Sequence, residues 1–161
     1  MKAISFTQHG LPIDDPRSLI DVNIDAPQPG PRDLLVEVQA VAVNPVDTKV
    51  RAGTFAKEPK ILGWDAAGIV RQVGADVTLF KPGDAVYYAG SLIRSGSYSE
   101  FQVVDERIVG HRPRTVDAAH AAALPLTSIT AWELLFDRLG VTEGGGEGEA
   151  DSTGHHPHRA I

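Results

Sequence analysis

The tetrapeptide Lys81-Pro82-Gly83-Asp84 constrains the fold most, because its residue types alone fix a backbone conformation. Proline presets φ at the second position of a β-turn and glycine accepts a positive φ at the third, so the segment predicts a type II turn. The turn reverses the chain into the apolar strand expected over residues 85–88. Residues 65–74 predict another strand before it, in which Gly68 and Gly74 indicate a bulge or a close backbone approach.

A second strong pattern covers residues 34–42. Apolar side chains alternate there with Glu37 and Gln39, which is the period of two expected of a half-buried strand. Shorter strands are expected over residues 2–7, 18–24, 97–105 and 107–109. Many short strands separated by glycine and proline turns favour a small barrel or sandwich over a βαβ repeat.

Helices are expected mainly near the end of the chain, after a possible helical turn over residues 48–53. Thr115 or Asp117 can cap a helix over residues 118–124, which Pro125 ends or kinks. The next segment spaces four large apolar residues as on one helix face, with Gly140 suited to the C-cap. They are Trp132, Leu135, Phe136 and Leu139. This amphipathic helix needs a partner surface.

The chain changes character after Thr142. Residues 143–161 are rich in glycine, acidic residues and histidine, lack apolar periodicity, and therefore predict a disordered tail after a domain over residues 1–142. Its glycines neither follow a strand nor open a helix, which argues against a phosphate-binding loop. The histidines at positions 155, 156 and 158 are expected to be solvated, because such a tail gives a metal no fixed geometry.

Composition excludes several classes of function. The 161 residues carry a formal net charge of -6, which argues against nucleic acid or an anionic membrane as partner. The absence of cysteine excludes disulfides, thiolate nucleophiles and cysteine-ligated zinc. No apolar run reaches the length of a membrane span, so a cytoplasmic location is expected.

The order and spacing of several short motifs carry a resemblance to a known family. The motifs are Val43-Asn44-Pro45-Val46-Asp47, Arg51-Ala52-Gly53, Gly63-Trp64-Asp65-Ala66-Ala67-Gly68-Ile69-Val70, Val73-Gly74 and Gly83-Asp84-Ala85-Val86. The chain resembles the N-terminal catalytic domain of the medium-chain dehydrogenase/reductase superfamily, in its quinone-oxidoreductase and zinc-type-alcohol-dehydrogenase-like branch. The resemblance implies a mostly β, GroES-like, partly open barrel with peripheral helices. It also implies that the Rossmann nucleotide-binding domain is missing, because no strand and G-x-G-x-x-G loop follow the last helix.

The resemblance bears on zinc as well. The family's zinc-dependent alcohol dehydrogenases hold the catalytic metal with a cysteine where Asn44 stands and a histidine where Trp64 stands, beside a glutamate where Asp65 stands. Tryptophan cannot ligate zinc and asparagine is a poor replacement for thiolate. We therefore expect no bound zinc.

Zinc-free relatives transfer hydride from NADPH to a quinone or enone, so the protein's task is positioning. The resemblance places Asn44, Asp47 and Thr127 at the cofactor. From the residues alone, Asn44 can be a turn residue, and Asp47 and Thr127 can be helix caps. Tyr87 and Tyr88 line the substrate side or belong to the core.

The expected function is therefore NAD(P)H-dependent oxidation or reduction of quinones, enones or alcohols, with no catalytic residue assigned. The alternative is a non-enzymatic interaction module or an inactive fragment. Without a cofactor domain the chain alone is expected to be inactive, and to self-associate through the surface where that domain packs in relatives.

Overall fold

The computed structural model describes residues 1–53 and 60–142. Its strands are β1 (Lys2–Phe6), β2 (Ile20–Asn23), β3 (Asp33–Ala42), β4 (Lys60–Ile61), β5 (Asp65–Val73), β6 (Ala85–Ala89), β7 (Phe101–Asp105) and β8 (Val109–His111). Its helical segments are α1 (Pro45–Gly53), the 3₁₀ turn η1 (Glu106–Ile108), α2 (Ala118–Ala122), α3 (Pro125–Trp132) and the π-helical η2 (Glu133–Arg138).

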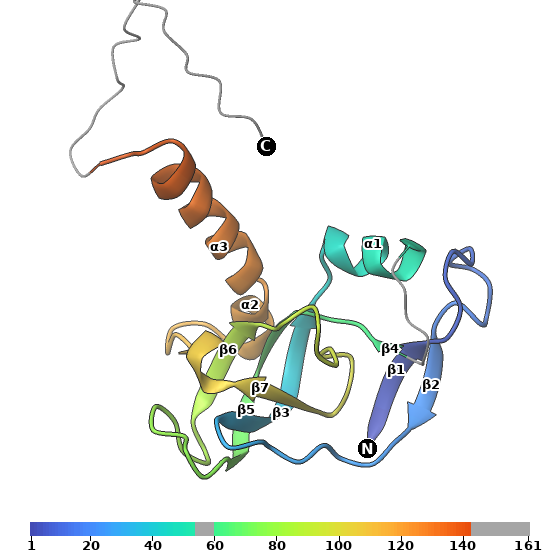
Figure 1. Ribbon diagram of the computed structural model, residues 1–161, viewed down its shortest axis with the longest axis horizontal. Helices are drawn as coiled ribbons and strands as arrows, with labels where there is room; N and C mark the ends of the chain where they lie inside the picture. Colours follow the sequence, from blue (N-terminus) through green and yellow to red (C-terminus); the bar gives the residue numbers. More distant parts are fainter. Residues whose placement is uncertain (54–59, 143–161) are drawn as a thin grey trace, which may run out of the picture. The chain divides into compact units, whose positions relative to one another are not determined.

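The strands form two antiparallel sheets, of order β2-β1-β4 and β7-β3-β5-β6-β8 (Figure 1). The chain just before β7 joins them, because Ile4 N donates to Tyr98 O at 2.8 Å and Val38 N donates to Glu100 O at 3.0 Å. Neither sheet closes on itself. The predicted mostly β, partly open barrel with peripheral helices is therefore confirmed.

The predicted turn and close approach are both present. Gly83 has φ of 96° and Asp84 N donates to Lys81 O at 3.2 Å, as a type II turn requires. A Cβ added to Gly68 would lie 2.2 Å from the backbone oxygen of Glu37 on the paired strand β3. The sequence therefore needs glycine at position 68 to let β3 and β5 approach.

The main core lies along β3, β5, β6 and β7, where alternate side chains point to one side. Its buried members are Leu34, Val36, Ala66, Val70, Val86, Tyr88 and Val104. Tyr88 donates its hydroxyl to Gln102 Oε1 at 2.8 Å, and burial raises the pKa of this tyrosine. Tyr88 therefore belongs to the core, one of the two roles that the sequence allowed.

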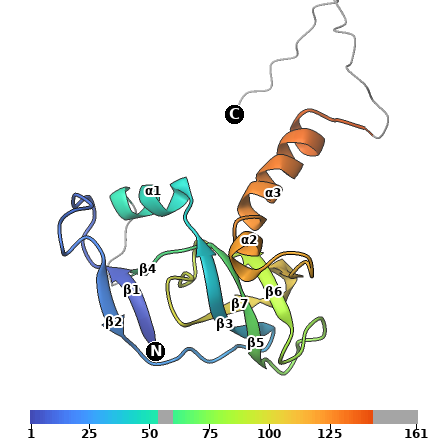
Figure 2. The same ribbon diagram turned by 180° about the vertical axis from the view of Figure 1, so that it is seen from behind.

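The helices α1 and α2 lie at the periphery of the barrel (Figures 1 and 2). α1 lies beside the end of β3 that leads into it, in both views (Figures 1 and 2). α2 packs on β3 and β5 through Ala121 and Ala122 against Ala67. Asp117 Oδ1 accepts His120 N at 2.8 Å, which confirms Asp117 as the N-cap of α2.

Two segments differ from the sequence expectation. Residues 107–109 were expected to be extended, but only Val109 is, as the first residue of β8; Arg107 and Ile108 belong to the turn η1, in which Asp105 accepts Arg107 N at 2.9 Å as the cap. The last helix was expected to run regularly to Leu139. It is α-helical to Trp132 and then widens into η2, where Leu139 N donates to Leu134 O at 3.0 Å, five residues back.

The chain divides into two compact units, Met1–Ile129 and Thr130–Ile161. The predicted tail over residues 143–161 lies outside the described residues.

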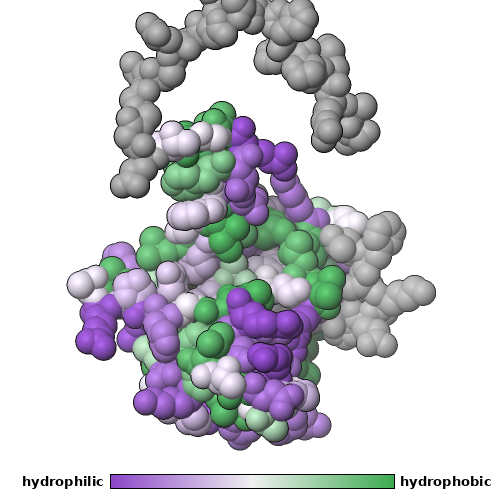
Figure 3. Space-filling model, turned by 60° about the vertical axis from the view of Figure 1, so that its left-hand side comes forward, coloured by the Kyte–Doolittle hydropathy of each residue, from purple (hydrophilic) through white to green (hydrophobic). Residues whose placement is uncertain are grey.

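Polar and apolar side chains mix on the face shown in Figure 3. None of the helices in residues 1–53 and 60–142 combines the length and apolar character needed to cross a membrane.

Candidate functional site

Asn44 and Pro45 set the start of α1, directly after β3. Proline takes the first helical position, where a backbone N–H would have no partner within the helix. The backbone N–H of Asn44 donates to Asp47 Oδ2 at 2.8 Å, which is half of a capping box. Asp47 thus acts as a helix cap, and its contact with a cofactor stays a prediction.

The other carboxylate oxygen of Asp47 binds the chain segment that leads into β5. Asp47 Oδ1 accepts the backbone N–H of Gly63 at 3.0 Å, and the side chain is buried. Burial, together with the charge of Asp47, raises the pKa of Tyr98 to about 12. Asp47 therefore fixes α1 to the segment that leads into β5.

Asp65 is the central group of the site, although the sequence did not single it out. Its side chain is 0% exposed at the start of β5. Asp65 Oδ2 accepts Asn44 Nδ2 at 2.9 Å, and Asp65 Oδ1 accepts the backbone N–H of Leu126 at 2.9 Å. Burial raises the pKa of Asp65, the two hydrogen bonds oppose that rise, and the charge of Asp47 adds to it.

Thr127 follows Leu126 in the first turn of α3 and is exposed. Its hydroxyl lies 3.1 Å from the backbone oxygen of Ala123 and 3.0 Å from that of Leu124, and donates to them. Thr127 is therefore inside the helix and not its cap. A lone pair of its oxygen remains for a ligand.

The structure thus brings the three predicted residues together. Asn44 and the α3 turn that carries Thr127 are bound to one carboxylate, Asp65, while Asp47 fixes the backbone of Asn44. The sequence does contain a signal for Asp65, because this charged residue stands at the start of the apolar run of residues 65–70.

The donor set at the family's zinc positions does not fit zinc. The amide nitrogen of Asn44 is bound to Asp65, and the ring of Trp64 is buried among Phe6, Val50 and Leu62. Among the described residues no group of three or more histidine, cysteine, aspartate or glutamate side chains is arranged to hold a metal ion. Neither position can offer the ligands that zinc takes.

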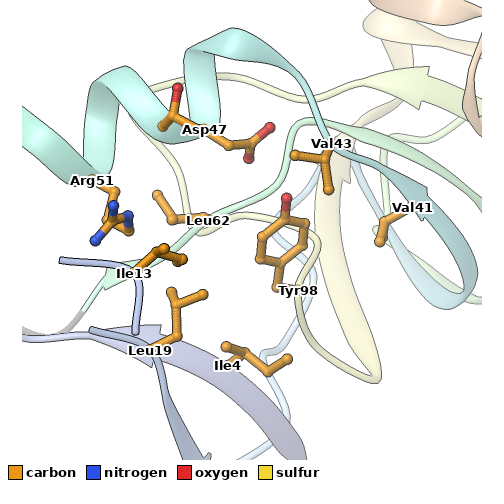
Figure 4. Close-up of a pocket in the computed structure, with 10 residues that line it drawn as sticks. Ile4, Ile13, Leu19, Val41, Val43, Asp47, Arg51, Leu62 and Tyr98 are labelled. Atoms are coloured by element: carbon orange, nitrogen blue, oxygen red, sulfur yellow. The ribbon is translucent and has the colours of Figure 1, made fainter. Parts of the chain in front are cut away.

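An apolar pocket of about 310 Å³ lies beneath α1 (Figure 4). Ile4, Ile13, Leu19, Val41, Val43, Leu62 and Tyr98 line it, with Asp47, Thr48 and Arg51 from α1. The polar groups of α1 are already bound, since Arg51 Nη1 donates to Leu11 O at 2.7 Å and Thr48 Oγ1 to Pro45 O at 2.9 Å. The pocket therefore suits an apolar group.

Comparison with known proteins decides the family. Residues 30–114 match the alcohol dehydrogenase GroES-like domain. The chain belongs to this family. Its sequence is 40% identical over 152 residues to a zinc-type alcohol dehydrogenase-like protein of Staphylococcus epidermidis, covering 94% of this chain and 45% of that protein. The chain thus spans less than half the length of this curated relative.

Solved structures share the fold of this chain. A protein of Rhizobium etli CFN 42, assigned as a zinc-dependent alcohol dehydrogenase, is 60% identical with a TM-score of 0.83, over 86% of this chain and 40% of its own. The Escherichia coli quinone oxidoreductase complexed with NADPH is 33% identical with a TM-score of 0.75, over 84% of this chain and 40% of its own. The resemblance to the quinone-oxidoreductase and zinc-type branch is confirmed.

Proposed function

We propose that this chain is the catalytic domain of an NAD(P)H-dependent oxidoreductase that acts on quinones, enones or alcohols. The observation that carries the proposal is the joint attachment of Asn44 and of the α3 turn bearing Thr127 to the buried carboxylate of Asp65. Two oxygens, Asn44 Oδ1 and Thr127 Oγ1, are thereby held on one rigid frame. The NADPH complex of the Escherichia coli relative supports this choice of cofactor.

The residues of the chain supply positioning. A bound nicotinamide supplies the hydride. Asn44 and Thr127 orient the cofactor by hydrogen bonds, Asp47 and Asp65 hold these two residues in place, and the pocket beneath α1 receives the apolar part of the substrate. Fixing both reactants at near-attack distance is sufficient for a direct hydride transfer. Because the zinc positions do not fit the metal, no step of the proposal uses one.

The alternative, an interaction module without catalysis, has one observation in its favour. Large apolar side chains are exposed from Trp132 onward in the described chain. They are Trp132, Leu134, Leu135, Phe136, Leu139 and Val141. We propose that this apolar segment drives self-association of the chain.

The cytoplasm remains the expected location, because a protein without cysteine needs no oxidising compartment for disulfides.

The test is an NADPH oxidation assay with a panel of quinones, enones and alcohols. It compares the chain with a fusion that adds the nucleotide-binding domain of the Escherichia coli quinone oxidoreductase after residue 142. We expect no turnover by the chain alone and restored turnover by the fusion, since the pyrophosphate and ribose contacts lie in that domain.

Two control fusions test the site. Asn44→Ala and Thr127→Ala should each lower kcat/KM by about tenfold. Turnover that neither substitution changes would contradict the site assignment. A folded fusion that reduces none of the substrates favours the interaction module instead.

A further inference from the structure

Asp65 accepts hydrogen bonds at both ends of its carboxylate, from two segments far apart in the sequence. Asn44 lies 21 residues before it and Leu126 lies 61 residues after it. We propose that Asp65 is a positioning residue that turns the oxygen of Asn44 toward the ligand, so that the site selects a neutral hydrogen-bond donor. The proposal rests on the proposed function and assigns the chemistry of its cofactor contact.

The orientation of Asn44 follows from the chemistry of its partner. An ionised carboxylate only accepts hydrogen bonds, so the NH₂ group of Asn44 must face Asp65. Its Oδ1 then points away from Asp65, and no donor among the described residues binds that oxygen. The backbone of Asn44 is held as well, because its N–H donates to Asp47. The side-chain amide of Asn44 thus cannot flip by 180° without breaking its hydrogen bond to Asp65.

Thr127 presents the same chemistry from α3. A hydroxyl has one proton, and that of Thr127 is used on the backbone oxygens of Ala123 and Leu124. Its oxygen can therefore only accept a hydrogen bond from a ligand. The preceding residue, Leu126, is bound to Asp65. One carboxylate thus fixes the positions of two acceptor oxygens.

Two acceptors define the class of group that binds. A carboxylate or phosphate has no proton to donate at neutral pH and would leave both oxygens unsatisfied, which disfavours its binding. A primary amide or a hydroxyl has the required donor. The nicotinamide end of a cofactor offers both groups, the ring amide and the ribose hydroxyls.

An isosteric substitution inverts the polarity of the site. In Asp65→Asn, the new side chain has one carbonyl and one NH₂ group. The backbone N–H of Leu126 donates to the side-chain carbonyl of the new asparagine, so the NH₂ group of that asparagine faces Asn44. The side-chain amide of Asn44 then has to rotate so that its oxygen accepts from this NH₂ group. The exchanged pair Asn44→Asp/Asp65→Asn restores the pattern, because the new carboxylate at position 44 accepts from the new amide at position 65 and presents its other oxygen to the ligand.

The first readout is NMR of the whole chain and needs no ligand. In the wild type, the side-chain NH₂ of Asn44 and the backbone N–H of Leu126 converge on one carboxylate, so we expect a nuclear Overhauser effect between them. Asp65→Asn should lose it. Its absence from the wild type, or its persistence in Asp65→Asn, would overturn the proposal. The wild-type result decides if the variant does not fold.

The second readout is titration with nicotinamide, nicotinate and nicotinate riboside, followed at Asn44 and Thr127. Nicotinamide should bind the wild type and the exchanged pair, and bind Asp65→Asn about tenfold more weakly. Binding of nicotinate riboside but not nicotinamide identifies the ribose hydroxyls as the donor. Binding of nicotinate as tight as that of nicotinamide, or no shift with any probe, overturns the ligand class.

The two proposals fail separately. A fusion that reduces no substrate removes the proposed function, but the orientation of Asn44 is measured without cofactor or turnover. Conversely, an active fusion whose Asp65→Asn variant keeps the orientation of Asn44 removes only the role of Asp65. The matched control is Thr127→Val, which keeps the shape of the side chain and removes its acceptor, and so should weaken nicotinamide binding without changing Asn44.

Discussion

Glu106 is a fully buried carboxylate away from the candidate site, and its partners come from two segments of the chain. Its Oε2 accepts the backbone N–H groups of Thr78 at 2.9 Å and Leu79 at 2.8 Å, and its Oε1 lies 2.7 Å from Arg32 Nη1. The bonds from Leu79 and Thr78, with that from Arg32, hold the pKa of Glu106 below its usual value. The ionised form therefore stabilises the fold.

The sign of this shift predicts an acid-dependent stability. Because the pKa of Glu106 is lower in the folded state, its contribution is present above about pH 4.5 and is lost as pH falls below that value. We expect Glu106→Gln to lower Tm at neutral pH by roughly 5–10 °C and to flatten the acid dependence of Tm. Circular dichroism melts across pH provide the measurement.

Glu37→Gln is the matched control, since Glu37 pairs with Arg71 at the surface, where such pairs contribute little. Parallel pH dependences of Tm in the wild type and in Glu106→Gln would refute the role of Glu106.

At this scale the sequence predicts local roles better than distant ones. The cap of α2 at Asp117 and the turn glycine at position 83 follow from neighbouring residues, and both are confirmed. The roles of Asp65 and Glu106 are harder to predict, because their partners, backbone N–H groups among them, lie many residues away in the sequence. Only the fold brings such donors to a carboxylate.

Among the secondary-structure elements, β3 and β5 depend most on a small residue. An added Cβ at Gly68 would lie 2.2 Å from Glu37 O and 2.7 Å from Val36 Cγ1, closer than atoms can pack. We expect Gly68→Ala to push the two strands apart and to lower the free energy of unfolding by about 1–3 kcal/mol. Urea denaturation measures this change.

Gly53→Ala serves as the control, because nothing lies within 4 Å of a Cβ at the end of α1. That variant should be unchanged or slightly more stable. Equal stabilities of Gly68→Ala and the wild type would show that the strands can move apart without cost.

The elements that the sequence predicted well have periodic patterns. In those that it predicted less well, the backbone forms hydrogen bonds that the pattern does not indicate. The alternation of residues 34–42 agrees with β3. Residues 97–100 also read as strand, but their backbone groups bridge β1 and the segment before β5, so β7 begins only at Phe101. The helical spacing after Trp132 does not reveal the wider η2, because one extra residue per turn changes little in the pattern.

For the molecule as a whole, the exposed apolar segment from Trp132 onward predicts association. Trp132 is 63% exposed and packs against Phe136 with ring centroids 4.5 Å apart and the ring planes tilted by 48°, so the two rings form one apolar surface. Burial of such a surface between two copies of the chain is favourable, and tryptophan contributes most at the centre of an interface. We therefore expect dimers or larger species at high concentration.

Sedimentation velocity over a range of concentrations tests this expectation. Trp132→Asp should raise the dissociation constant by at least about tenfold, because a charge would be buried without a partner. The control is Ile93→Asp, which removes an apolar side chain that is 94% exposed in the other compact unit and should leave association unchanged. A wild-type chain that stays monomeric at the highest concentration, or equal effects of the two substitutions, would show that the apolar segment from Trp132 onward does not drive association.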